Sequence, residues 1–162
     1  MDLQLWHFYS WKNLNNEKIF GLLVEKTEKW LHFRLWDQEY NQEWDGWMLV
    51  NLELITDFVE IQEIPPQDGN FLPQEFLFGK SFEKFFYKKK MCNVVYRLDD
   101  EIFDEFWVLF YKWKYVRFFP IDVNGKYDDK HYLAEISTIA SVEYASQYTA
   151  HLEEIAENFP SF

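Results

Sequence analysis

The stretch KWLHFRLWD at residues 29–37 has a counterpart of the same rhythm, KYVRFFPID, at residues 114–122. Residues 19–37 lie over residues 104–122 without a gap, and in this superposition Lys29 falls on Lys114. In a strand, successive side chains point to opposite faces, so a shared apolar rhythm indicates shared burial. The repeat therefore predicts two similar β-rich units in one chain.

The repeat continues after a one-residue slip. Asp45 then falls on Asp129, and the apolar positions 52, 55 and 58 fall on positions 136, 139 and 142. The run PPQDGN at residues 65–70 is the clearest turn signal between the two copies. We predict a first β-barrel-like unit at 1–64, a linker with a short helical segment at 65–90, and a second unit with a C-terminal helix at 91–162.

Alternating apolar side chains predict the individual strands. The expected strands cover residues 3–9, 19–24, 30–36, 47–50, 58–64, 94–98, 106–111, 115–121, 132–135 and 140–144. Single short helical turns are expected at 52–56 and 136–139, and residues 99–105 read as an acidic turn. A closing helix is expected at 148–158, with Leu152, Ile155 and Ala156 on its buried side.

Residues 19–60 resemble small SH3-like or Sm-like barrels. The resemblance rests on Gly21 in a bent early strand, on WLHF at residues 30–33, and on DGW at residues 45–47. The second copy departs from this pattern, with Phe106 in the place of Gly21 and Lys130 in the place of Gly46. The resemblance implies a mostly β protein of two small antiparallel barrels in tandem, with one or two short helices.

The chain is strongly acidic and unusually rich in rings. Its formal net charge is −12, and aromatic residues make up 22% of its 162 residues. An acidic surface repels phosphate, which argues against broad nucleic-acid binding and favours a basic partner. That many large rings exceed what two small cores readily bury, so some are expected at the surface or between the halves. The basic run at Lys88–Lys90 is flanked by acidic sequence, which weakens it as a nucleic-acid arm.

No pattern in the chain points to catalysis or to a cofactor. The histidines, His7, His32, His131 and His151, lack zinc-ligand spacing, and His32 is expected on the polar face of a strand. A lone cysteine, Cys92, excludes an internal disulfide framework. The loop at residues 122–129 lacks the ligand spacing of a calcium site. No leader and no long apolar run are visible, so a cytoplasmic location is expected.

The positive signal is a combination of rings and carboxylates. Tryptophans and acids gather around one loop, and a denser acidic run follows later. Rings supply desolvated anchors that stack with guanidinium groups, and acids steer a basic partner. The candidate partner-binding residues are Trp36, Asp37, Glu39, Glu43, Trp44, Asp45, Asp99, Asp100, Glu101 and Asp104. Trp36 and Trp44 are the tryptophans expected to be exposed.

These features favour a non-enzymatic binding protein. In its size, acidity and ring content the chain is similar to immunity and inhibitor proteins, which implies a basic, nuclease-like toxin or effector as partner. The alternative is an Sm-like or SH3-like module in an RNA-associated or regulatory assembly. An unrecognised hydrolase is a third reading and would require a concave site with convergent polar groups. The sequence leaves the oligomeric state open.

Overall fold

The computed structural model describes residues 2–67, 90–112, 114–128 and 130–156, without the side chains of residues 90 and 104–112. The strands are β1 (Phe8–Lys12), β2 (Lys18–Lys26), β3 (Trp30–Asp37), β4 (Glu43–Asn51), β5 (Val59–Ile61), β6 (Lys90–Leu98), β7 (Glu101–Lys112), β8 (Tyr115–Pro120), β9 (Tyr132–Glu135) and β10 (Ile139–Tyr144). A short helical turn, η2 (Ile136–Thr138), precedes β10, and the helix α1 (Gln147–Ile155) follows it. The prediction of a mostly β protein is confirmed.

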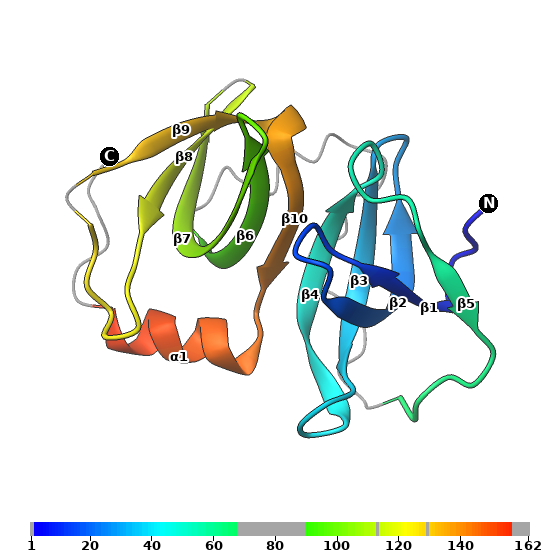
Figure 1. Cartoon of the computed structure of the whole chain (residues 1–162). Helices are drawn as coiled ribbons and strands as arrows, with labels where there is room; N and C mark the ends of the chain where they lie inside the picture. Colours follow the sequence, from blue (N-terminus) through cyan, green and yellow to red (C-terminus); the bar gives the residue numbers. More distant parts are fainter. Residues whose placement is uncertain (1, 68–89, 113, 129, 157–162) are drawn as a thin grey trace.

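All the strands belong to one sheet of ten, in the order β5-β1-β2-β3-β4-β10-β6-β7-β8-β9 (Figure 1). Each neighbouring pair is antiparallel. In each half of the order, the half's last strand lies beside its first. We call β1–β5 the first half and β6–β10 with α1 the second half. The two halves meet where β4 pairs with β10.

The register of the two halves follows the superposition of their sequences. The N–H of Leu52 donates to the carbonyl of Lys29 at 2.9 Å, and that of Ile136 donates to the carbonyl of Lys114 at 3.0 Å. Likewise β3 and β4 pair Trp30 with Asn51, and β8 and β9 pair Tyr115 with Glu135. The halves thus share a backbone pattern at residue resolution.

Each of the two equivalent lysines forms an ion pair, although the glutamates that they contact are not equivalent residues. Lys29 Nζ lies 3.5 Å from Glu53 Oε1, and Lys114 Nζ lies 3.1 Å from Glu135 Oε1. The hydrogen bond from Lys114 lowers the pKa of Glu135, and Glu135 raises the pKa of Lys114. Both pairs are exposed, so neither stabilises the fold appreciably.

The sheet is open. No pairing among the described strands closes either half into a barrel, because β5 and β9 stand at the two ends of the strand order. The coarser part of the fold prediction, antiparallel and mostly β with a C-terminal helix, therefore holds without the closed barrels. None of the described helices is long and apolar enough to cross a membrane.

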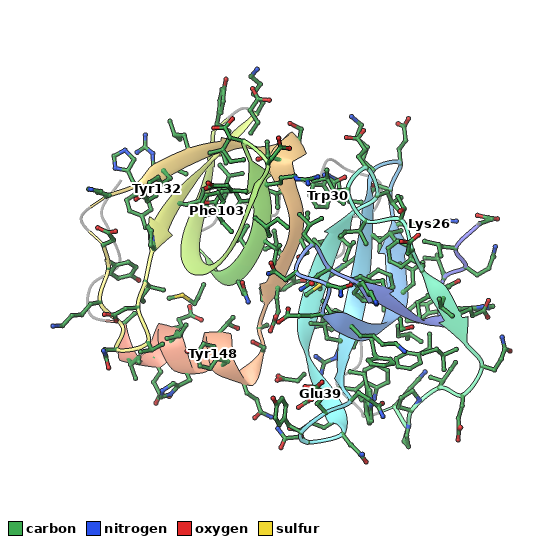
Figure 2. The ribbon with its side chains drawn as sticks, viewed as in Figure 1. Lys26, Trp30, Glu39, Phe103, Tyr132 and Tyr148 are labelled. Atoms are coloured by element: carbon green, nitrogen blue, oxygen red, sulfur yellow. The ribbon has the colours of Figure 1, made fainter. Side chains whose placement is uncertain are left out.

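The buried residues form a core in each half, and each core includes a residue from the other half. The first-half core contains Trp11, Phe33 and other residues of β1–β4, together with Ala140 of β10. The second-half core includes Leu49 of β4 and Trp30 of β3. Figure 2 shows Trp30 between the ribbons of the two halves. The two cores therefore share residues across the pairing of β4 with β10.

Several predicted boundaries are wrong. The first strand begins at Phe8 rather than at residue 3, because Trp6 takes a φ of 67° and turns the chain before it. The strand also continues past its predicted end at residue 9, and Trp11 in it is 2% exposed. The expected acidic turn at 99–105 is only two residues wide, since Leu98 pairs directly with Glu101.

Other predicted elements agree with the structure or lie outside it. The helix α1 packs Leu152, Ile155 and Ala156 against Met91 and Ile121, as its apolar spacing predicts. Ser146 caps this helix, accepting from the N–H of Thr149 at 3.2 Å. Of the predicted linker and short helical segment at 65–90, residues 68–89 lie outside the described part, and Lys90 begins β6.

Gly46 makes a bulge in β4 where the two halves meet. Asp45 and Gly46 together stand opposite Leu35, since Arg34 pairs with Trp47 and Trp36 with Trp44. Gly46 has a φ of +77°, and a Cβ there would lie 2.9 Å from the Cβ of Ser146. Both the conformation and the close approach to the cap of α1 demand glycine.

Replacing Gly46 with alanine should therefore lower the free energy of unfolding by about 1–3 kcal/mol. Urea denaturation followed by tryptophan fluorescence measures this. Gly46→Asn separates the two causes, since asparagine tolerates positive φ but still carries a Cβ. A comparable loss in both variants indicates the close approach, whereas wild-type stability in Gly46→Ala would contradict the account.

Candidate functional site

The tryptophans expected at the surface are largely packed away. Trp44 is 8% exposed, so the prediction that it is exposed is wrong, and Trp36 is half-buried. The ring of Trp36 meets that of Trp44 edge-on at 5.1 Å, and Phe8 approaches Trp44 at 6.0 Å. The indole N–H of Trp44 donates to the carbonyl of Pro66. These rings belong to a second buried cluster of the first half, which also includes Leu22, Val24 and Trp47.

Two of the predicted partner-binding carboxylates are engaged within the chain. Asp45 Oδ1 accepts the backbone N–H of Gln147 at 2.8 Å, and Glu43 Oε1 accepts the side-chain amide of Gln147 at 2.6 Å. Gln147 is the first residue of α1, whose unsatisfied N–H groups favour a negative charge. Glu43 and Asp45 therefore tie β4 to the helix of the second half.

Asp37 is the last residue of β3, and Glu39 lies on the loop between β3 and β4. The carboxylate of Asp37 accepts the N–H groups of Tyr40 at 3.1 Å and Asn41 at 3.2 Å, which fixes the loop. Glu39 is exposed at the loop end of this hairpin, where Figure 2 labels it. Tyr40 beside it is 83% exposed, the highest among the large hydrophobic residues described.

Both carboxylates line a cleft of about 610 Å³, which we call the acidic cleft. Its wall is formed by the turn after β1, the β3–β4 loop and parts of β6 and β10. Its acidic residues are Glu17, Asp37, Glu39 and Glu143, and its one lysine among the described residues is Lys18. The cleft joins residues far apart in sequence, and its charge is strongly negative.

The second predicted acidic group lies elsewhere. Asp99 and Asp100 form the two-residue turn between β6 and β7, with φ values of 50° and 63°, and both are exposed. The ladders from Trp47 through Tyr144 to Cys92 place this turn at the opposite end of the strands from the β3–β4 loop. Glu101 is also exposed there.

Asp104 completes the predicted set. It lies in β7, where its backbone pairs with Val95 of β6, and its side chain is outside the described part. The predicted residues therefore do not converge on one face. Of the ten, only Asp37 and Glu39 line the acidic cleft.

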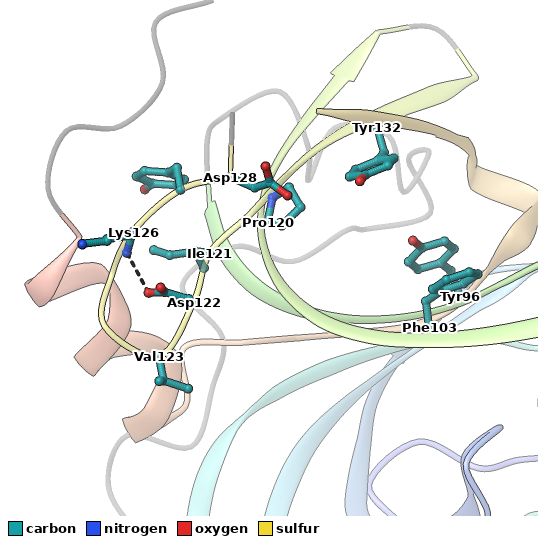
Figure 3. A pocket seen from close by; sticks show the side chains of 10 residues that line it. Tyr96, Phe103, Pro120, Ile121, Asp122, Val123, Lys126, Asp128 and Tyr132 are labelled. Atoms are coloured by element: carbon teal, nitrogen blue, oxygen red, sulfur yellow. Dashed lines mark hydrogen bonds between the residues drawn. The ribbon is translucent and has the colours of Figure 1, made fainter. Parts of the chain in front are cut away.

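The structure also contains a cavity that the sequence did not reveal, of about 640 Å³ in the second half (Figure 3). Tyr96 and Phe103 stack at 4.9 Å on one side of it, and Tyr132 lies across from them. These rings come from β6, β7 and β9 and share no sequence motif, so no local signal could have found them. Burial raises the pKa of Tyr127, which also lines this cavity, and the carboxylate of Glu153 acts in the same direction.

The loop that superficially suggests calcium binding is held by its own backbone. Asp122 Oδ1 accepts the N–H groups of Asn124 at 2.8 Å and Lys126 at 3.0 Å, the second of which is dashed in Figure 3. Within the described part of the chain, no three His, Cys, Asp or Glu side chains are grouped to hold a metal ion.

His32 is buried rather than on a polar face, since both faces of β3 are covered. Its Nε2 shares a hydrogen bond of 2.7 Å with the hydroxyl of Tyr144, and its Nδ1 lies 3.7 Å from Glu25 Oε2. His32 is 1% exposed, so no substrate reaches it in this structure. Its contacts link β3 of the first half with β10 of the second.

The phenylalanine variant at position 144 should destabilise the protein. Tyr144→Phe keeps the ring but removes the hydrogen bond to buried His32, which should cost about 1–3 kcal/mol in the free energy of unfolding. Tyr40→Phe, at an exposed site, is the matched control and should change it by less than about 0.5 kcal/mol. Equal unfolding midpoints for the two variants would contradict a structural role for this bond.

Comparison with models of protein families, with curated proteins and with solved structures finds no match to this chain.

Proposed function

We propose that this chain is a non-enzymatic binding protein whose acidic cleft receives a basic segment of another protein. The observation that carries the proposal is the set of carboxylates around the cleft, Glu17, Asp37, Glu39 and Glu143, against the one lysine described there. A concave wall of one charge sign focuses the field and raises the association rate of the opposite charge.

The β3–β4 loop suits arginine in particular. Asp37 is held in place by the loop backbone, so its carboxylate is already ordered before a partner arrives. Exposed Tyr40 lies next to Glu39, so a guanidinium group can pair with a carboxylate and stack on a ring at once. Tyr40 takes the anchoring role for which Trp36 and Trp44 are too buried.

The partner class that fits this chemistry is a basic, nuclease-like toxin or effector, which makes the protein an immunity or inhibitor protein. A nuclease presents arginines and lysines where its substrate's phosphates bind. Carboxylates at the end of a rigid sheet are negatively charged like those phosphates, so they can bind the same arginines and lysines. The net charge of −12 supports fast, salt-sensitive association with such a surface.

A second candidate is the Sm-like or SH3-like assembly module. The repeated strand order of the two halves supports the assembly part of this reading. The acidic cleft counts against RNA as its ligand, because carboxylates repel the phosphate backbone.

Fluorescence anisotropy with a labelled oligo-arginine peptide tests the cleft. Glu39→Lys should weaken binding about tenfold, since it removes an attraction and adds a repulsion at the wall. Glu101→Lys makes the same charge change at the other end of the strands and should have a much smaller effect. Binding of the wild-type protein should also fall steeply as salt is added.

Two outcomes would count against the proposal. Equal weakening by Glu39→Lys and Glu101→Lys would mean that net charge, not the cleft, attracts the peptide. Tight, salt-sensitive binding of a labelled single-stranded RNA, in place of the peptide, would favour the second candidate. Circular dichroism of both variants checks that each is folded.

A further inference from the structure

The joint between the halves is a strand pairing whose central pair is completely buried. β4 and β10 place Leu49 opposite Val142, and each of these side chains is 0% exposed. On either side of it, Met48 stands opposite Glu143 and Val50 opposite Ser141. In the strand order, β4 is the last strand of the first half and β10 is the first strand of the second half. Each contributes to the joint the edge that faces away from its own half.

The repeat gives each of these strands a counterpart at an end of the sheet. β9 stands to β8 as β4 stands to β3: His32 pairs with Leu49, and Arg117 pairs with Leu133. Since His32 falls on Arg117 in the sequence superposition, Leu133 occupies the place of Leu49.

The other counterpart is β5, which pairs with β1 as β10 pairs with β6. Tyr9 stands opposite Glu60, and Asn93 stands opposite Glu143. The dipeptide Val-Glu at residues 59–60 thus matches the Val-Glu at residues 142–143. In the strand pairing Val59 therefore occupies the place of Val142, one residue beyond Phe58, on which Val142 falls in the sequence superposition. The difference follows the register shift of β10 between Ile139 and Ser141.

These counterparts are exposed where the joint residues are buried. Leu133 is 58% exposed and Val59 is 61% exposed. The same contrast holds one strand further in, because Trp30 is 6% exposed near the joint and its counterpart Tyr115 is 38% exposed. None of the described strands pairs with the outer edge of β5 or of β9. The unpaired N–H and C=O groups of an edge strand are a template for the addition of another strand, and exposed apolar side chains on that edge favour the addition.

We propose that β9 of one molecule pairs antiparallel with β5 of a second copy of this chain, in the register of the internal joint. Leu133 then lies opposite Val59 of the next molecule, and Tyr132 lies opposite its Glu60. The two edges differ, so the contact is heterologous and repeats from copy to copy into a ring or a filament. The inference rests on the repeated strand order and not on the acidic cleft.

Cysteine cross-linking tests the register. Val59→Cys and Leu133→Cys chains, mixed under mild oxidation, should form a covalent dimer, because opposed residues bring their Cβ atoms within about 4.5–5.5 Å. The native cysteine, Cys92, is 0% exposed and should stay unreacted. Tyr132→Cys replaces Leu133→Cys in the control mixture, since a one-residue shift turns the side chain to the other face.

The expected result is a dimer in the first mixture and at least severalfold less in the control mixture and in each variant alone. Equal yields in all samples, or no dimer in any, would overturn the proposed register.

Edge charges test the heterologous contact without cross-linking. The wild-type protein should form assemblies whose mass, by sedimentation, grows with concentration. Leu133→Lys retains an intact β5 edge and Val59→Lys retains an intact β9 edge, so each alone should be monomeric. Their equimolar mixture should form a dimer capped at both ends, and no larger species.

A wild-type protein that stays monomeric at all concentrations, or a mixture that stays monomeric, would overturn the proposal. Leu133→Lys should bind the oligo-arginine peptide as the wild type does, so failure of assembly and failure of the acidic cleft give different results.

Discussion

The pairing of β4 with β10 is the contact on which the rest of the structure depends. It joins two five-strand halves into one sheet and brings Leu49 and Val142 into full burial. Burying each of these side chains contributes about 1.5–3 kcal/mol. Because Leu49 belongs to the second-half core and Ala140 to the first-half core, neither core is complete without the other half.

Polar contacts reinforce this joint at several depths. The buried amide of Asn51 donates to the carbonyl of Ile139 at 3.0 Å, and His32 bonds to Tyr144. At the outer end, Glu43 and Asp45 hold the start of α1. The carboxylates that the sequence predicts to bind a partner therefore have different roles in the structure. Some fasten the halves together, and others, Asp37 and Glu39, are left to line the acidic cleft.

Much of the fold could be predicted because its signals are local and repeated. The strand at 132–135 and the buried side of α1 follow directly from apolar periodicity. Lys29 and Lys114, which the sequence superposition makes equivalent, each accept a backbone hydrogen bond through their carbonyl groups. The donors are the N–H groups of Leu52 and Ile136, each at the start of a short turn after a strand. The sequence predicts too early a start for β1, because Leu3 and Leu5 continue the alternation of apolar side chains. The turn at Trp6 is instead set by its backbone conformation.

The candidate site was less predictable because it depends on contacts between distant residues. Nothing near Trp44 in sequence indicates that Phe8 covers its ring, and nothing near Asp45 indicates that its carboxylate accepts the N–H of Gln147. His32 shares one face of its strand with Trp30 and Arg34, which gives no sign that β10 brings Tyr144 within hydrogen-bond distance of it. Glu17 and Glu143 join the cleft through strand order alone, which periodicity does not encode.

The long separation of β4 and β10 along the chain has a consequence for biosynthesis. On the ribosome, β4 is complete when Asn51 has been added, but its partner strand ends only at Tyr144. At a synthesis rate of about 5–20 residues per second, the edge of β4 that pairs with β10 stays unpaired for several seconds before β10 is synthesised. Slower translation would lengthen this interval, so holding chaperones should matter more to the yield of this protein than to that of a chain whose neighbouring strands are consecutive.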